Sequence, residues 1–403
     1  MSLTFLETAD RIGARLCRDA IWAGQRCNWL GGYGDDPSAI VHCALDHYLY
    51  QGSSGIALFL FQLGAATGEK VFRITAEGAL RRTLSKLGDV RAWRLGFYDG
   101  LAGIAYVAAR AAEITGDEAH ASEALRLAHE LDADRARIDV INGSAGVIAA
   151  LLYLHRLRRG DFLLELAIRH GQRLVDRANR SDAGWSWTTA DRQSRDLTGF
   201  AHGAAGIAWA LLELFQITQE EKFRCAAAEA FRYEQSVYRS EEENWPDFRR
   251  PSGVDPDGNA TFECALAWCH GAPGIGLSRL RAWQILGQEI HRGEALAAIR
   301  TTSKSVGDLG EGSYSLCHGH AGNAELLLYA GQVLEDREYL SLAEKVGETG
   351  IEKYEKEKVP WPCGVPGGDE TPDLMIGLAG IGYFYLRLHD ALASPPILIV
   401  VPE

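Results

Sequence analysis

A short glycine motif recurs along the whole chain of 403 residues and restricts the folds that it can adopt. Gly-x-x-Gly followed by an apolar stretch occurs seven times, at spacings of 48, 43, 60, 68, 48 and 58 residues. A single motif of this kind marks only a turn, but seven in register indicate a repeat architecture. Each interval has room for two helices and their loops. The first glycines of the seven copies are Gly52, Gly100, Gly143, Gly203, Gly271, Gly319 and Gly377.

Two kinds of predicted helix alternate along the chain. The run that follows each glycine motif is apolar nearly all round, which predicts a buried helix. The more polar stretches between these runs carry apolar residues at intervals of three and four, which predicts helices with one buried face. These amphipathic stretches include residues 71–87, 118–131, 162–178, 220–235 and 290–306.

Seven buried helices covered by seven amphipathic ones predict an all-α fold, the α/α toroid, with an inner and an outer ring of helices. The paired glycines let the chain turn sharply and let backbones approach closely at one crowded end of the ring. An open solenoid is the alternative, but it exposes two terminal faces and needs capping repeats. We therefore expect residues 1–403 to form a single toroidal domain.

Composition excludes several classes of protein. The net charge of −13 argues against a nucleic-acid groove. The sequence has no stretch of 18 or more uncharged apolar residues that predicts a membrane span. Its first residues lack the basic region and cleavage site of a signal peptide. We expect a cytoplasmic protein whose eight cysteines are free thiols or metal ligands.

In two of the seven motifs the first glycine completes the same tripeptide, Cys-His-Gly, which begins at Cys269 and again at Cys317. Thiolates and imidazoles are the ligands that a tetrahedral zinc selects. The two copies occupy equivalent positions of neighbouring repeats, so their sulfurs can converge. A structural zinc finger would place its pairs closer together in a small module. The pattern therefore favours a catalytic zinc.

The residue just before the first glycine should lie at the same height of the ring in every repeat. It is polar in six of seven copies, directly above helices that are otherwise apolar. We therefore expect a pocket at one mouth of the ring. Asp139, four residues before Gly143, can reach over the same mouth. The seven residues at this position are Gln51, Asp99, Asn142, His202, His270, His318 and Ile376.

Several segments, together with the sevenfold repeat, resemble the lanthionine synthetase C-like (LanC-like) cyclases over nearly the whole chain. They are FAHGAAGIA at 200–208, WCHGAPGIG at 268–276 and LCHGHAGNAE at 316–325. The resemblance is closest to the cyclase half of the bifunctional class II lanthipeptide synthetases, which NWPDFR at 244–249 also resembles. The dehydratase half is absent, so we expect either a stand-alone cyclase or an excised half.

The resemblance implies a Zn²⁺ held by Cys269, Cys317 and His318, with a fourth position open for a cysteine thiol of a dehydrated precursor peptide. Such a cation stabilises the thiolate. The thiolate adds to dehydroalanine or dehydrobutyrine and forms the lanthionine or methyllanthionine thioether. His202 matches the family residue that is the candidate proton donor to the enolate. Asp139 matches an acid that helps to deprotonate or orient the thiol.

One position departs from the family. Separate cyclases often carry an arginine four residues before the first zinc cysteine, where this chain has Ala265. Stabilisation of the enolate must then come from elsewhere, and His270 and Arg249 are the candidates. His270 is also the second candidate for an acid.

The resemblance further implies a precursor peptide with a leader and a separate dehydratase or kinase/lyase partner. Three other functions remain open. An enzyme that adds a small thiol such as glutathione to dehydrated peptides would share every motif. A scaffold subunit of a peptide-modifying complex would not need the intact zinc ligands. A carbohydrate-active α/α toroid would need paired carboxylates facing a cleft, and no repeat offers such a pair at the mouth.

Overall fold

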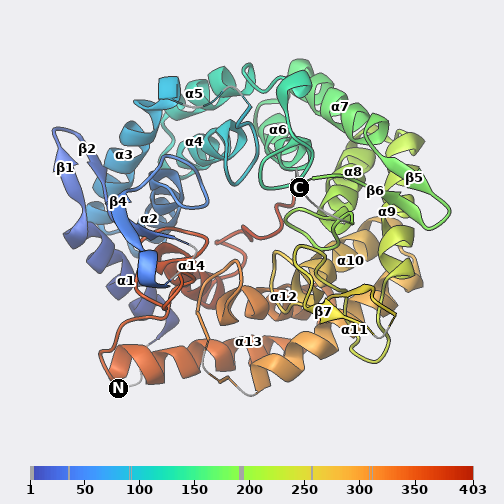
Figure 1. The fold of residues 1–403 in the computed structure, drawn as a ribbon. Coiled ribbons are helices and arrows are strands. Elements are labelled where there is room, and N and C mark those ends of the chain that lie inside the picture. Colours follow the sequence, from blue (N-terminus) through green and yellow to red (C-terminus); the bar gives the residue numbers. More distant parts are fainter. Residues whose placement is uncertain are drawn as a thin grey trace.

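The computed structural model describes residues 4–34, 37–89, 91, 93–189, 195–255, 257–307, 309–310 and 312–402. Within these residues, fourteen α-helices form two concentric rings (Figure 1). The inner ring consists of α2 (Ser53–Thr67), α4 (Leu101–Thr115), α6 (Ser144–Arg158), α8 (Ala204–Thr218), α10 (Ala272–Leu286), α12 (His320–Val333) and α14 (Leu378–His389). The outer ring consists of α1 (Phe5–Asp19), α3 (Lys70–Leu84), α5 (Glu118–Ala128), α7 (Asp161–Asp176), α9 (Glu221–Ser236), α11 (Glu289–Gly307) and α13 (Arg337–Gly350).

The predicted toroid is confirmed. Each inner helix packs against the next one, and α14 packs against α2, so the inner ring is closed. Each of the outer helices α3 to α13 packs against the inner helix that precedes it, and α1 covers α14. All seven inner helices have one of the predicted first glycines as their N-cap.

Inner helices are buried on almost every side, so the few charged residues that they carry are paired. Arg281 of α10 binds Glu213 of α8, with 2.6 Å between Nε and Oε1. Arg387 of α14 binds Glu325 of α12 at 3.1 Å. Buried charges are tolerated when they are paired in this way. The pairs therefore link neighbouring helices of the inner ring.

The short strands lie in loops, where they form four antiparallel hairpins. They are β1 (Ile21–Ala23) with β2 (Arg26–Asn28), β3 (Leu30–Tyr33) with β4 (Val41–Ala44), β5 (Asn179–Ser181) with β6 (Gly184–Ser186), and β7 (Gly253–Val254) with β8 (Ala260–Thr261). A π-helical segment, Ile351–Lys356, follows α13. Among the described residues, no helix is long and apolar enough to cross a lipid bilayer.

The second glycine of each motif allows a close approach between two stretches of backbone. An added Cβ at Gly103 would overlap the carbonyl oxygen of Phe97, and one at Gly206 would overlap that of Phe200. In all seven repeats the overlapped oxygen belongs to the residue six positions earlier. Glycine is therefore required by sterics at this position, as the repeat predicts.

A closed ring of seven backbone hydrogen bonds joins the turns that precede the inner helices. In each bond, the amide of the residue two positions before the first glycine donates to the carbonyl of its counterpart in the next repeat, at 2.8 to 3.4 Å. The bond from Met375 to Tyr50 closes the ring. The members in chain order are Tyr50, Tyr98, Ile141, Ala201, Cys269, Cys317 and Met375.

The C-terminal segment runs from α14 into the middle of the ring (Figure 1). The hydroxyl of Tyr98 donates to the carbonyl of Ile397 at 2.6 Å, and the indole of Trp268 donates to that of Leu398 at 2.8 Å. The side chains of residues 397–400 are buried. This segment therefore fills the middle of the ring with apolar side chains.

Replacing a second glycine should destabilise the protein. We expect Gly103→Ala to lower the free energy of unfolding by about 1–3 kcal/mol, because the new methyl group would overlap the Phe97 carbonyl. Urea-induced unfolding followed by circular dichroism measures this change. The control is Gly293→Ala in α11, whose added Cβ has nothing within 4 Å. That control should raise stability, by about 0.5–1 kcal/mol. Equal effects of the two substitutions would contradict the steric argument.

Candidate functional site

A cavity of about 550 Å³ lies at the end of the toroid where the inner helices begin. Five of the seven residues that precede the first glycines line it, which places a pocket at the expected mouth. These five are Gln51, Asp99, Asn142, His202 and His318. His270 and Ile376, both in described parts of the chain, lie outside the lining.

Cys269 and Cys317 are neighbours in the ring of backbone hydrogen bonds, with the Cys269 amide 3.4 Å from the Cys317 carbonyl oxygen. Both side chains are buried at the cavity wall. Their thiols hydrogen-bond to each other, and this interaction lowers the pKa of Cys269. The charge of the nearby Arg249 guanidinium acts in the same direction, whereas burial opposes both. The two sulfurs therefore converge, as their repeat positions indicate.

His318 lines the same cavity. Its Nε2 lies 3.0 Å from the carbonyl oxygen of Gly364, which leaves Nδ1 without a described partner. A histidine that binds a metal usually donates its other ring nitrogen to such an oxygen. Across the described residues, no three His, Cys, Asp or Glu side chains lie close enough together to hold a metal in this conformation. The donor types fit zinc, and the ligand set stays a prediction.

His202 forms a short hydrogen bond with Asp139, from Nδ1 to Oδ2 at 2.6 Å. The His202 side chain is 32% exposed and lines the cavity. Burial disfavours the charged imidazolium, but the Asp139 carboxylate outweighs it and raises the pKa of His202 above its ordinary value. Because Nδ1 is bound to Asp139, Nε2 is the ring nitrogen that can exchange a proton with a substrate.

Asp139 lies deeper than its sequence position indicates. It is 2% exposed and stands behind His202, outside the lining of the cavity. Its second oxygen, Oδ1, accepts a hydrogen bond from the amide of Asn142 at 2.6 Å. The carboxylate thus makes both the loop hydrogen bond and the contact with His202. In this structure the His202 ring stands between Asp139 and the cavity, so the geometry is that of a group that orients His202.

His270 is 1% exposed, and its Nδ1 lies 3.2 Å from the carbonyl oxygen of Thr198. Its ring centre is 6.0 Å from that of His202. Burial and the charge of Arg249 lower the pKa of His270 to about 3. Gly271 follows with a φ of +95°, the only one of the seven first glycines with a left-handed backbone. A buried, neutral ring is a weaker candidate for a proton donor than His202.

Arg249 reaches the cavity from the loop that carries the NWPDFR segment. Asn244 anchors this loop, because its Oδ1 accepts from the amide of Ala272 at the start of α10. Asp247 orients the arginine, with 2.6 Å from Nη2 to Oδ2 and 3.0 Å from Nε to Oδ1. Neither Asp247 nor any other described residue binds Nη1. Ala265 lies on the same loop but lines a neighbouring cavity.

Some residues of the cavity wall carried no recognised sequence signal. Tyr50 lines the cavity and its hydroxyl interacts with the Cys317 thiol. It holds the same repeat position as Cys317, and that register is the signal that could have identified it. Arg94 lies 3.0 Å from Asp99 and 3.9 Å from Asp46, measured from Nη1 to the carboxylate oxygens. Asp46 and Arg94 also share a repeat position, since each lies six residues before the first glycine of its motif and its carbonyl accepts from the amide seven residues on.

Comparison with known proteins assigns the chain to a family. The family model described as lanthionine synthetase C-like protein matches residues 44–399. The chain belongs to this family. The matched residues include every residue of the cavity lining except Tyr33 of β3, which lies before them.

Individual LanC-like relatives are distant. The lacticin 481/lactococcin biosynthesis protein LcnDR2 of Lactococcus lactis subsp. lactis is 23% identical over 89% of this chain, which spans only 38% of that protein. The glutathione S-transferase LANCL1 of Danio rerio is 23% identical over 84% of this chain and 81% of its own length. The solved structure of nisin cyclase superimposes with a TM-score of 0.67 at 19% identity, covering 89% of this chain and 92% of that one. This last similarity shows a shared fold.

Asp139→Asn should shift the titration of His202 to lower pH. The substitution removes the charge that raises the pKa of His202 and keeps an oxygen for the Asn142 amide. NMR of ring-labelled histidine measures the shift, and Asp134→Asn, at an exposed position of the short 3₁₀ helix Ala133–Arg135, is the control. Because the folded-state pKa is raised, the stabilisation from protonated His202 is complete below about pH 6.5 and is lost as the pH rises through the raised value. An unchanged titration would show that Asp139 does not set the charge of His202.

Proposed function

We propose that the protein is a zinc-dependent lanthipeptide cyclase, which joins cysteine thiols of a dehydrated peptide to dehydroalanine or dehydrobutyrine residues. One observation carries this proposal. The two cysteine thiols that touch each other, and the His202 ring that Asp139 orients, line one cavity at the mouth of a LanC-like toroid. Thiol activation and proton transfer are the two chemical tasks of such an addition, and each has a candidate group there.

Cys269, Cys317 and His318 would hold the zinc, which supplies a Lewis acid that stabilises the substrate thiolate. His202 carries out the proton transfer. As the sulfur bonds to the β-carbon of the dehydro residue, the electron pair of the carbon–carbon double bond moves towards the carbonyl group. Nε2 of His202 then donates a proton to the α-carbon, and the proton from the substrate thiol replaces it. The sum is the addition of S–H across the double bond, with no atom lost.

Arg249 is the group best placed to replace the family arginine that is missing at Ala265. Its charge acts on both Cys269 and Cys317, and its Nη1 is available to an enolate oxygen. A guanidinium in a partly buried site stabilises developing negative charge without reorganising. His270, the other candidate for this role, is buried and neutral. Arg249 therefore takes precedence.

Addition of a small thiol such as glutathione is the second candidate, which the name of the LANCL1 relative favours. The residues that activate the thiol would be the same, and only the thiol source would differ. In either case the dehydro residues come from a separate reaction that removes water from serine or threonine. We propose a dehydratase or a kinase/lyase as the partner that performs it.

Cys317→Ala should abolish both metal binding and activity. Freshly purified protein should hold about one zinc per chain, and this variant should hold almost none, since one of three protein ligands is missing. Plasma mass spectrometry measures the metal, and loss of free thiol at unchanged mass measures cyclisation of a dehydrated peptide. Cys225→Ala, which removes an exposed thiol on α9, is the matched control and should retain both. Purified, unchelated protein without zinc would refute the proposal.

His202→Ala should retain zinc but lose cyclisation by a factor of about 10²–10⁴, the usual contribution of a general acid. His291→Ala is a control, because His291 is a buried histidine of the outer helix α11 and does not line the cavity. The same mass-based assay measures the rate, and metal analysis verifies the zinc content. A wild-type rate in His202→Ala would shift the role to His270. Loss of zinc would mean that His202 is a ligand.

A further inference from the structure

A second cavity, of about 470 Å³, adjoins the first one and shares Tyr33, Asp46, Tyr48 and Arg94 with it. Its remaining wall comes from β4, the loop after β4, the end of α3 and the loop that follows α3. Among the described residues that line this cavity, four are basic and one is acidic. We call it the cationic cavity. Its basic residues are Arg82, Lys86, Arg91 and Arg94.

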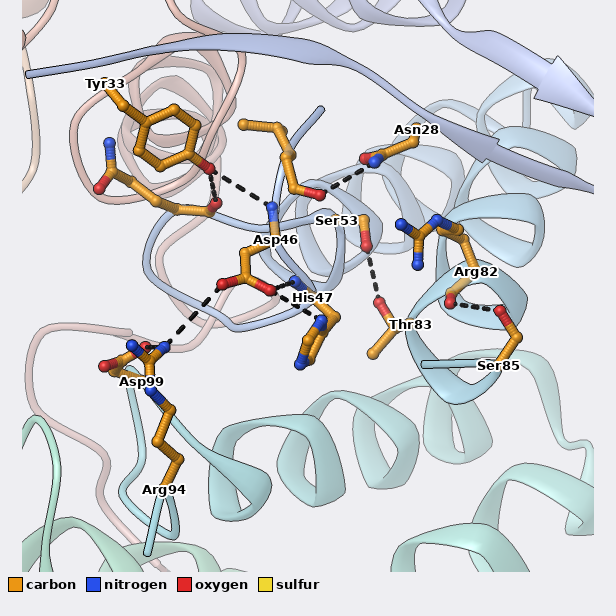
Figure 2. Close-up of polar contacts among 12 residues, drawn as sticks. Asn28, Tyr33, Asp46, His47, Ser53, Arg82, Thr83, Ser85, Arg94 and Asp99 are labelled. Carbon is orange, nitrogen blue, oxygen red and sulfur yellow. Dashed lines mark hydrogen bonds and ion pairs between the residues drawn. The ribbon is translucent and has the colours of Figure 1, made fainter. Parts of the chain in front are cut away.

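Asp46, the acidic residue among the described lining of the cationic cavity, is already engaged. Oδ1 of Asp46 accepts hydrogen bonds from Nδ1 of His47 at 2.8 Å and from the His47 amide at 3.0 Å. Its Oδ2 lies 3.9 Å from Nη1 of Arg94 (Figure 2). Asp46 therefore offsets the charge of Arg94 and does not neutralise Arg82 on α3.

Several nitrogens of this wall have no hydrogen-bond partner among the described residues. Nη1 of Arg82 is buried and unpartnered, and so is Nε of Arg94. In Figure 2 the backbone oxygen of Arg82 accepts from Ser85, and no dashed line joins the Arg82 guanidinium to a drawn residue. Buried polar groups in native proteins are usually satisfied, so the two arginine nitrogens mark a place for an acceptor.

We propose that the cationic cavity binds a carboxylate of the thiol-bearing substrate, next to the thiol site. The two cavities lie side by side because they share a wall, so one substrate can occupy both. The inference rests on the proposed function, which places the thiol in the first cavity. Arginine forks match carboxylates in geometry and charge. On a chain with a net charge of −13, such a cavity selects acidic groups locally. The carboxylate belongs either to an Asp or Glu near the reacting cysteine of a peptide, or to a small thiol such as glutathione.

Model peptides test the preference directly. Each peptide contains one dehydroalanine and one cysteine, with a single Glu placed at each flanking position in turn and Gln as the neutral match. For wild-type protein, Glu at one position should lower KM about tenfold relative to Gln, with kcat unchanged, as one charge-assisted contact provides. Arg82→Glu should remove this preference and favour Lys at the same position. KM for the Gln peptide should stay within about twofold, because Arg82 lies outside the cavity that holds the reacting groups.

Arg81→Glu is the matched control, since it makes the same charge change one residue away on α3. Arg81 is paired with Glu77 and does not line the cationic cavity. It should retain the preference for Glu. Equal losses in the two variants would reduce the effect to general electrostatics and overturn the site. Identical KM values for Glu and Gln peptides in wild-type protein would overturn it as well.

Unreactive peptides separate this inference from the proposed function. With Ala in place of dehydroalanine and Ser in place of Cys, fluorescence anisotropy gives Kd without any chemistry. A Glu preference in Kd that Arg82→Glu abolishes supports the carboxylate site even if no thioether ever forms, and in that case only the cyclase proposal fails. Glutathione that displaces the Glu peptide from wild-type protein but not from Arg82→Glu identifies the small thiol as the source. Displacement by inorganic phosphate but not by glutathione or acetate would overturn the assignment to a carboxylate.

Discussion

Seven backbone hydrogen bonds, closed into a ring by the bond from Met375 to Tyr50, determine where the residues of the site lie. Each contributes only about 0.5–1.5 kcal/mol net. Together they hold the turns of all seven repeats at one height, because each amide meets the carbonyl of its counterpart in the next turn. The side chains that follow the bonded residues therefore converge on one mouth, and five of them line the cavity there. The second glycine of each motif makes this arrangement possible, since a Cβ would overlap the carbonyl that starts the turn.

The features that depend on this repeat could be predicted from the sequence. Where sterics require glycine, the sequence has a glycine, so the motif predicted the start of every inner helix. The alternation of apolar and amphipathic helices predicted the closed ring. The proximity of Cys269 and Cys317 followed as well, because they hold one position in neighbouring repeats. The same register could have identified Tyr50, which interacts with Cys317 across the closure of the ring.

Features that depend on the loops could not be predicted in the same way. The intervals between motifs vary from 43 to 68 residues, and the longest contains the NWPDFR segment that brings Arg249 to the cavity. No periodicity fixes the path of such a loop. The depth of Asp139 was equally hidden, since it results from two contacts, with the Asn142 amide and with the His202 ring. The filling of the ring centre by residues 397–400 depends on Tyr98 and Trp268, which carry no motif that distinguishes them from other core aromatic residues.

The positions of nearby charges explain why the pKa is lowered at His318 and raised at His202, although both histidines line the same cavity. Burial lowers the pKa of His318 and Arg249 lowers it further, although the Gly364 carbonyl opposes them, so the neutral ring that can bind a metal is favoured. At His202 the buried carboxylate of Asp139 is close enough to outweigh burial, and the protonated ring that can act as an acid is favoured. Pairs of titratable groups with such opposed environments are typical of acid–base sites. The same reasoning accounts for Ala265. The proposed chemistry would need a positive charge near the thiols, and the loop that brings Arg249 to the cavity would supply that charge without an arginine at position 265.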